Sequence, residues 1–176
     1  MSSKRNGGAP RSLNTEALNR LALHYVGRYA TTQAKLASYL KRKLRERDWN
    51  DDIPPDVDAI VARCAALGYV DDRQFAENRS ASLGRRGYGG RRIGMALQSA
   101  GIARDIVADV MPSDEEAAAA ADAYARRKRI GQFGDPDPDP RVRNKQFAAM
   151  IRAGHSFELA KQFTNAVALT AQSEDV

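Results

Sequence analysis

The sequence predicts an all-α protein built from three tandem three-helix repeats. Apolar residues recur every three or four positions in nine short segments, which is typical of helices that bury one face. No segment alternates apolar and polar residues as a half-buried strand does. Stacked helical modules repeat such a spacing along the chain, although a single globule of nine helices has the same periodicity. The recurring positions are Leu36, Leu40 and Leu44, then Ile93, Leu97 and Gly101, then Gln146, Met150 and Gly154.

The breaks in this pattern predict the domain organisation. Ser, Gly and Pro are frequent in the first residues, and prolines interrupt the last third of the chain. The expected parts are a disordered basic tail at 1–13, three-helix modules at 14–70, 71–112 and 113–170, an Asp-Pro linker at 135–140 inside the third module, and a frayed end at 171–176.

The first module begins with an amphipathic helix. Thr31 and Thr32 can cap a second helix, which has leucines on one face and Lys and Arg on the other. Pro54 and Pro55 suit the first turn of a third helix, where no amide donor is needed, and Gly68 suits the residue after its end. The apolar stripe of the first helix comprises Leu18, Leu21, Ala22, Tyr25, Val26 and Tyr29.

The second module opens with a capping-box-like pair, Asp71 and Gln74. A glycine-rich loop at 84–90 precedes a fifth helix, which begins near Arg91 and ends at Gly101. A short sixth helix begins near residue 103. The residues expected to face inward on these two helices are Ile93, Ala96, Leu97, Ala100, Ile106 and Val110.

The third module opens with a capping box, in which Ser113 is the cap and Glu116 the third helical residue. Its first helix ends in the basic run Arg126–Arg129, which has the correct sign for a helix C-terminus. The prolines at 135–140 predict an extended linker, because each disfavours helix before it. Ser156 is expected to cap the ninth helix. The apolar residues of the last two helices are Phe147, Met150, Ile151, Leu159, Phe163 and Val167.

The net charge of +6 is unevenly distributed. Residues 1–50 carry 11 basic and 3 acidic residues, whereas residues 51–72 carry 1 basic and 6 acidic residues. Such segregation favours a polyanion or an acidic protein surface as the partner, although charged stretches are also typical of a solvated face.

The cysteine and histidine content excludes several classes of protein. Cys64 is the only cysteine, so an internal disulfide is impossible, and with His24 and His155 it does not make a zinc cage. No apolar run approaches the roughly 20 residues of a membrane span, and no signal-peptide core follows Met1. We expect a monomeric protein of the reducing cytoplasm, without a metal or a membrane anchor.

Candidate catalytic residues are few. Cys64 lies on an apolar helical stripe, which indicates a buried structural thiol. The adjacent carboxylates Asp51-Asp52 and Asp71-Asp72 suit caps and turns better than an acid–base pair. The glycine-rich loop lacks the lysine of a phosphate-binding loop and follows a helix rather than a strand. We therefore expect no enzymatic activity and no cofactor.

The same loop is more informative as a binding element. Arginines in the first turn of a helix work against the helix dipole. An anion there would be held by the dipole, the backbone amides and the guanidinium groups together, although a turn with solubilising arginines is the alternative. The candidate contact residues are Arg85, Arg86, Tyr88, Arg91 and Arg92, with Lys41, Arg42 and Arg45 of the second helix as a weaker set.

Two motifs resemble the RecX family of regulatory proteins. The first is Gly68-Tyr69-Val70-Asp71-Asp72-Arg73-Gln74-Phe75-Ala76, and the second is Gly87-Tyr88-Gly89-Gly90-Arg91-Arg92-Ile93, continued by Leu97, Gly101 and Ile102. Family members share a G-Y-x-D-D-x-x-F-A element and a G-x-G-x-x-x-I-x-x-x-L-x-x-x-G-I element at this separation. The resemblance covers roughly residues 15–167, and the chain departs from it with His155 where the family has an aromatic residue.

The resemblance implies an elongated, curved array of three-helix repeats that is not an enzyme. It implies binding to the RecA recombinase filament on single-stranded DNA and inhibition of its ATPase, strand-exchange and co-protease activities, hence a part in recombination, DNA repair and the SOS response. Contact with single-stranded DNA itself would be weak or indirect. An independent helical nucleic-acid-binding module is the alternative, although the second helix has no Asn or Gln beyond Gln33 for reading bases.

The resemblance also assigns motif residues to the fold. Tyr69 and Phe75 would pack between the first two modules, and Asp71 would cap a helix. The full set of expected structural residues is Tyr69, Asp71, Asp72, Phe75, Ala76, Gly87, Gly89, Ile93, Leu97 and Gly101.

Overall fold

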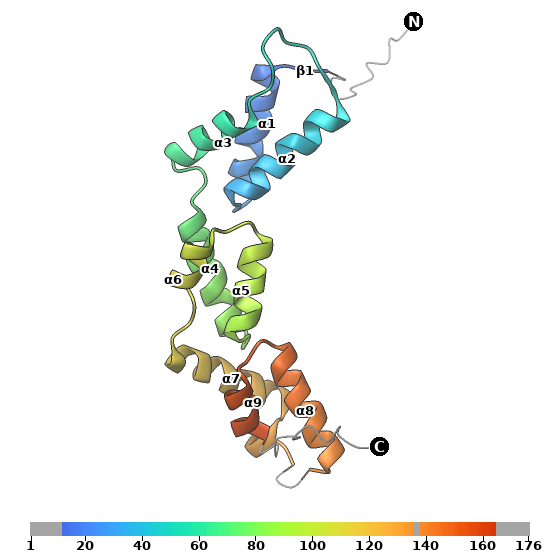
Figure 1. Cartoon of the computed structure of the whole chain (residues 1–176), viewed down its shortest axis with the longest axis vertical. Coiled ribbons are helices and arrows are strands. Elements are labelled where there is room, and N and C mark those ends of the chain that lie inside the picture. Colours follow the sequence, from blue (N-terminus) through green and yellow to red (C-terminus); the bar gives the residue numbers. More distant parts are fainter. Residues whose placement is uncertain (1–11, 136–137, 165–176) are drawn as a thin grey trace, which may run out of the picture. The chain divides into compact units, whose positions relative to one another are not determined.

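The computed structural model describes residues 12–135 and 138–164, in which the regular structure is almost entirely helical (Figure 1). This confirms the predicted all-α class. The predictions for residues 1–11, for 136–137 of the linker, for Val167 and for 171–176 lie outside the described residues. The elements are β1 (Ser12–Leu13), α1 (Thr15–Arg28), α2 (Gln33–Glu46), β2 (Asp48–Trp49), α3 (Val57–Ala66), α4 (Asp72–Arg85), α5 (Gly90–Ser99), α6 (Arg104–Asp109), α7 (Asp114–Lys128), the 3-10 helix η1 (Gly131–Phe133), α8 (Pro140–Arg152) and α9 (Phe157–Thr164).

The helices pack in groups that agree with the predicted repeat. Each of α1, α2 and α3 packs against the other two, each of α7, α8 and α9 does the same, and α5 packs against α6. The exact module boundaries stay a prediction. By its contacts the chain divides into two compact units: unit 1 is Met1–Phe75 with Ala100–Ile102, and unit 2 is Ala76–Ser99 with Ala103–Val176.

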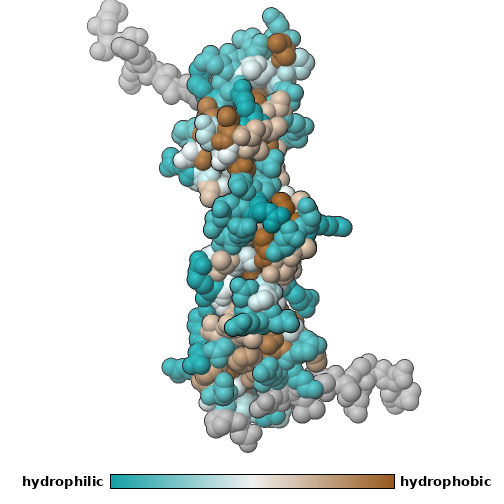
Figure 2. Space-filling view, turned by 90° about the vertical axis from the view of Figure 1, so that its left-hand side faces the viewer, coloured by the Kyte–Doolittle hydropathy of each residue, from teal (hydrophilic) through white to brown (hydrophobic). Residues whose placement is uncertain are grey.

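The core of unit 1 is made by leucines at helical spacing. Leu18 of α1 and Leu36 and Leu40 of α2 are fully buried, and Val57 and Ile60 of α3 pack against them. Because each helix contributes only one narrow stripe, the core is thin, and the face drawn in Figure 2 is mostly hydrophilic with small groups of hydrophobic residues.

Side chains at helix starts tie the segments of unit 1 together. Thr32 caps α2, where its Oγ1 accepts from the Lys35 amide at 3.2 Å and donates to the Ala100 carbonyl at 2.6 Å. The amide of Gln33 donates to Oδ1 of Asp72 at 2.9 Å. A cap predicted from the sequence thus also makes long-range contacts.

The core of unit 2 is rich in alanine. Ala121 and Ala125 of α7, Met150 of α8 and Ala160 of α9 are completely buried, which lets these helices approach closely. The predicted capping box of α7 is present, because Ser113 Oγ accepts from the Glu116 amide at 3.2 Å and the Glu116 carboxylate accepts from the Ser113 amide at 2.9 Å.

Glycines end helices as predicted. Gly68 has a φ of +72°, and its amide donates to the Ala65 carbonyl while that of Tyr69 donates to the Cys64 carbonyl, which is a Schellman motif. Gly101 also has a positive φ, of +79°.

The start of α3 was wrongly predicted. Pro54 and Pro55 precede the helix, which begins at Val57 after the cap Asp56. Oδ1 of Asp56 accepts from the Ala59 amide at 2.9 Å, so the side-chain acceptor sets the helix start.

A small sheet was missed. Ser12–Leu13 pairs in parallel with Asp48–Trp49, and the Asn50 amide extends the ladder to the Leu13 carbonyl at 2.7 Å. Two-residue strands are too short to show alternation, so the sequence pattern carried no signal for them.

The face of α6 was also wrongly predicted. Val107 is buried, whereas Ile106 and Val110 are only half-buried. A helix of six residues makes less than two turns, so two apolar residues spaced by four do not define its inner face.

The extended linker ends one residue earlier than predicted. Pro140 is the first residue of α8, whose cap Asp139 accepts from the Arg141 amide at 2.7 Å. A proline at this position needs no amide partner, so it starts the helix instead of preventing it.

Candidate functional site

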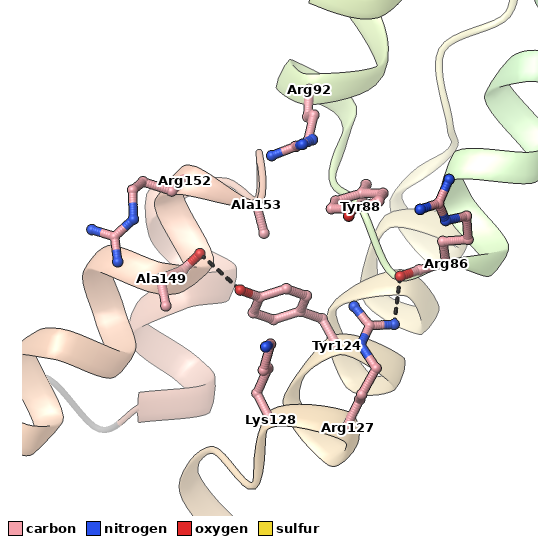
Figure 3. Close-up of a pocket in the computed structure, with 9 residues that line it drawn as sticks. All are labelled: Arg86, Tyr88, Arg92, Tyr124, Arg127, Lys128, Ala149, Arg152 and Ala153. Atoms are coloured by element: carbon pink, nitrogen blue, oxygen red, sulfur yellow. Dashed lines mark hydrogen bonds between the residues drawn. The ribbon is translucent and has the colours of Figure 1, made fainter.

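A cavity of about 610 Å³ in unit 2 brings together five cations and two tyrosines (Figure 3). We call it the cationic pocket. Its walls come from the α4–α5 loop, α5, the end of α7 and the end of α8. The lining residues are Arg86, Tyr88, Arg92, Tyr124, Arg127, Lys128, Ala149, Arg152 and Ala153.

Two glycine-containing loops meet beside the pocket. The Gly89 amide donates to the Ala153 carbonyl at 3.0 Å, and the Arg91 amide donates to the Gly154 carbonyl at 3.1 Å. A Cβ on Gly89 would overlap the carbonyl group of Gly154, and one on Gly87 would lie 2.9 Å from the Tyr124 nitrogen. Only glycines allow the backbones to approach so closely, which fixes the α4–α5 loop against the α8–α9 loop.

His155 is part of the same junction. It is 1% exposed, and its Nε2 lies 3.2 Å from the Gly87 carbonyl, to which the neutral ring donates. Burial lowers the pKa of His155, and the hydrogen bond to Gly87 opposes this only in part. His155 therefore has a structural role as a neutral donor that holds the glycine loop.

The tyrosines hold the guanidinium groups in place. The Cζ of Arg92 lies 4.4 Å from the Tyr88 ring centroid and that of Arg86 lies 5.5 Å from it. Arg127 lies 5.3 Å from the Tyr124 ring and donates to the Arg86 carbonyl at 2.6 Å. Cation–π contact occupies the faces of these groups, so the N–H edges of Arg86 and Arg92 remain able to donate to a ligand.

The pocket cations have no counter-ions among the residues that the structure describes. Within 12–135 and 138–164, no acidic residue lines the cavity and none of the five cations forms an ion pair with a carboxylate. Arg126, in the same basic run, differs because its Nε lies 2.6 Å from Oδ2 of Asp122. The net positive charge of the pocket is therefore available to an anion.

The structure separates the arginines that the sequence grouped together. Arg86, Tyr88 and Arg92 line the cationic pocket, whereas Arg85 lines a neighbouring hollow and Arg91 is exposed outside both. The expected contribution of backbone amides is corrected in part, because the amides of Gly89, Arg91 and Arg92 already donate to carbonyls. An anion at this site would be held mainly by side chains.

The weaker set lies on α2 in unit 1. We call Lys41, Arg42, Lys43 and Arg45 the basic face of α2. Lys41 Nζ lies 3.7 Å from Asp58, Arg42 Nε 3.6 Å from Glu46 and Lys43 Nζ 2.6 Å from Glu46. The hydrogen bond from Lys43 lowers the pKa of Glu46. Two carboxylates therefore offset part of the charge of these four cations.

The residues expected to have structural roles lie at several places in the fold. Asp71 accepts from the Gln74 amide at 2.9 Å, and Phe75 is half-buried with the Lys35 ammonium 5.2 Å from its ring. Tyr69 is 53% exposed instead of packed, and its amide donates to the Cys64 carbonyl at the end of α3. Ala76, Ile93 and Leu97 are fully or almost fully buried, and Asp72 accepts from the Gln33 amide at the start of α2. Gly87 and Gly89 lie close to the backbone of other segments, and Gly101 lies against the Ala34 side chain.

Sequence reasoning missed Arg127, Lys128 and Arg152 as members of the site. The sequence shows the basic run at the end of α7, but the helix dipole accounts for that run without a ligand. Only the packing of α7 and α8 beside the α4–α5 loop brings these side chains to Arg92.

The described residues contain no group of three or more His, Cys, Asp and Glu side chains that could hold a metal ion. Cys64 is buried, and burial raises the pKa of its thiol. Among the described helices, none has the length and apolar character needed to cross a membrane.

The sequence is similar to that of known proteins of one family. A family model described as RecX, second three-helix domain, matches residues 71–111. The chain is 31% identical over 162 residues to the regulatory protein RecX of Myxococcus xanthus, covering 87% of each chain. It is 28% identical over 159 residues to that of Agrobacterium fabrum, covering 88% of this chain and 84% of the relative.

Two solved structures have a similar fold. The crystal structure of RecX from Lactobacillus salivarius matches with a TM-score of 0.65 at 18% identity, over 86% of this chain and 94% of that one. A crystal structure of a regulatory protein RecX matches with a TM-score of 0.64 at 20% identity, over 86% of this chain and 73% of that one.

Proposed function

The chain belongs to the RecX family of regulatory proteins, and from this premise we propose that it binds the RecA recombinase filament on single-stranded DNA and inhibits its ATPase, strand-exchange and co-protease activities. The observation that carries the proposal is the cationic pocket, whose five cations lack counter-ions in the described part of the chain. A filament of protein on DNA offers phosphates and acidic side chains, which such a pocket would attract.

The proposal describes a regulator that binds and does not catalyse. In it the protein acts as a monomer in the cytoplasm, without a cofactor. Contact with DNA alone is weak and depends strongly on salt, because it comes from charge and not from reading bases. A sequence-specific DNA complex that survives high salt would instead support an independent nucleic-acid-binding module.

The direct test is ATP hydrolysis by RecA on single-stranded DNA with increasing amounts of the purified protein. We expect hydrolysis to fall as the protein is added. Unchanged hydrolysis at several-fold excess of the protein would contradict the proposed function.

Substitutions in the first turn of α5 locate the contact. Arg91→Glu combined with Arg92→Glu should abolish inhibition and leave helicity intact, because glutamates suit the start of a helix. The single variants separate the two residues: Arg92→Glu should lose most of the inhibition, since Arg92 lines the pocket, and Arg91→Glu should keep most of it. Full inhibition by the double variant would place the contact elsewhere, with the basic face of α2 as the next candidate.

A further inference from the structure

We infer that the cationic pocket is a binding site for a compact phosphate chain, meaning two or more directly linked phosphate groups, as in pyrophosphate or a nucleoside triphosphate. The inference goes beyond the proposed function, because it concerns a small ligand of the chain alone. The volume of the cationic pocket, about 610 Å³, lies within the range of small-molecule sites.

The charge of the pocket determines the class of ligand. Five cations face one cavity without a described carboxylate to neutralise them, so they repel one another when the site is empty. A single carboxylate would offset one of the five charges. A phosphate chain places several negative charges within a few bonds, which matches the density of positive charge.

The geometry of the donors is also suited to phosphate. Arg92 and Arg86 are held over Tyr88, with their N–H edges free to form the paired hydrogen bonds that phosphate oxygens accept (Figure 3). Lys128 and Arg152 add two cations from α7 and α8. These side chains come from four segments around one cavity, with Arg152 pointing away from the others in Figure 3, so the cations are grouped around a compact space and do not form a linear track.

A strand of nucleic acid fits the arrangement less well. Its phosphates carry one charge each and are separated by sugars, so proteins bind them along extended basic grooves, with exposed aromatic rings on which bases stack. In the pocket, Tyr88 and Tyr124 are already in contact with Arg92 and Arg127. Tyrosines used in this way position the cations and are not open platforms for bases.

The test is calorimetric titration of the full chain, without RecA, with pyrophosphate, with ATP and with a short oligothymidylate. We expect pyrophosphate and ATP to bind with one-to-one stoichiometry and to compete with each other. Absence of pyrophosphate binding would overturn the inference. Oligothymidylate binding that pyrophosphate does not displace, but that needs the pocket residues, would also overturn it and assign the pocket to nucleic acid.

Two matched double variants locate the binding. Arg92→Gln with Arg152→Gln removes two charges from the pocket, and Arg91→Gln with Arg104→Gln removes two exposed charges outside it in the same unit. We expect at least about tenfold weaker pyrophosphate binding for the first and less than about twofold for the second, because charge-assisted hydrogen bonds are lost only in the first. Equal weakening in both would show non-specific attraction and overturn the inference.

Circular dichroism confirms that each variant is folded, and Arg152→Gln alone serves if the pocket double variant is not. Arg152 is exposed on the last residue of α8, so its removal should not affect folding. Because RecA is absent from this experiment, its failure leaves the proposed function intact. Conversely, normal pyrophosphate binding together with no effect on RecA would contradict only the proposed function.

Discussion

The basic face of α2 in unit 1 and the cationic pocket of unit 2 contain the same kinds of side chain but differ in their counter-ions. Lys43 and Arg42 share the Glu46 carboxylate at 2.6 and 3.6 Å, and Lys41 lies 3.7 Å from Asp58. The five pocket cations have no such partner in the described residues. The number of basic residues in a stretch of sequence is therefore not a measure of the charge that a ligand meets.

Contact with tyrosine does not explain the difference. The Tyr39 ring lies 5.6 Å from the Arg42 guanidinium and 5.8 Å from the Lys43 ammonium, much as Tyr88 contacts Arg92 in the pocket. Both sets of cations are positioned by aromatic rings. What distinguishes them is that the acids of α2 and α3 lie beside the basic face of α2, whereas Asp122 of α7 pairs with Arg126 and no acid is among the described residues that line the pocket.

The largest effect is expected from breaking the junction of loops beside the pocket. Gly89→Ala should lower the free energy of unfolding of unit 2 by about 3 kcal/mol, because the new Cβ meets backbone atoms that cannot rotate away. A matched change in unit 1, Gly27→Ala, has nothing within 4 Å of the new Cβ and should be neutral or stabilise α1 by up to about 1 kcal/mol.

Urea unfolding followed by circular dichroism measures both changes. Similar stability of the two variants would show that the loops beside the pocket can move. The pocket would then lack a rigid support for binding an anion.

A smaller effect is expected from giving the pocket the counter-ion that α2 has. Ala149→Glu adds a carboxylate to the lining from α8, where glutamate is compatible with a helix. It should weaken binding of pyrophosphate about tenfold, because the acid pairs with pocket cations and repels the ligand. Ala149→Gln has nearly the same size without the charge and should weaken binding much less. Equal losses in the two variants would show that bulk, not charge, matters there.

Helix starts could be predicted from the sequence because their causes are local. Thr32, Asp71, Ser113 and Ser156 each accept a hydrogen bond from an amide three residues later, and this contact depends only on the residue type and its distance along the chain. The glycines that end helices follow for the same reason. The pair of Lys43 with Glu46 was equally visible as a three-residue spacing, and it was overlooked.

The pocket could be predicted only in part, because its causes are not local. Arg86, Tyr88 and Arg92 lie within seven residues, and their chemistry suggested an anion site. Their partners Arg127 and Arg152 follow many residues later and reach the site only through helix packing. Sequence patterns predict which face of a helix is buried, but not which loop that helix packs against.

The buried histidine of unit 2 makes its stability depend on pH. His155 is buried in unit 2, and burial lowers its pKa, so in the folded state it binds its proton only at a lower pH than in the unfolded chain. The stability that it contributes is present above the pKa of the unfolded histidine and is lost as the pH falls towards the lowered folded value. We expect the protein to be less stable at pH 5 than at pH 7, as measured by thermal unfolding.

Substitution separates the two histidines. His155→Gln keeps a donor near the Gly87 carbonyl and removes the titration, so it should flatten the dependence of stability on pH between 5 and 7. His24→Gln makes the same substitution at an exposed position of α1 and serves as the matched control for the change of residue type. A flat profile for the original protein would show that His155 titrates as easily when folded as when unfolded, and that its burial does not matter.

The smallest effect is expected from removing the counter-ion of α2, which would make this face more like the pocket. In a chain whose pocket is silenced by Ala149→Glu, Glu46→Gln should strengthen salt-dependent binding to a single-stranded oligonucleotide about twofold, because exposed ion pairs are weak and their loss frees little charge. Glu158→Gln on α9 makes the same change in net charge without freeing a described cation. Fluorescence anisotropy at low salt measures both.

The pH dependence of this last effect identifies the carboxylate as its cause. The hydrogen bond from Lys43 lowers the pKa of Glu46. The ion pair therefore persists as the pH falls, and it is lost only when the pH is below the usual pKa range of a glutamate. Below that point the pocket-silenced chain should bind the oligonucleotide equally well with and without the Glu46→Gln change, since Glu46 itself is then neutral. If Glu46→Gln binds no better than Glu158→Gln at neutral pH, internal counter-ions do not limit the basic face of α2, and the difference between the two regions must come from the shape of the pocket alone.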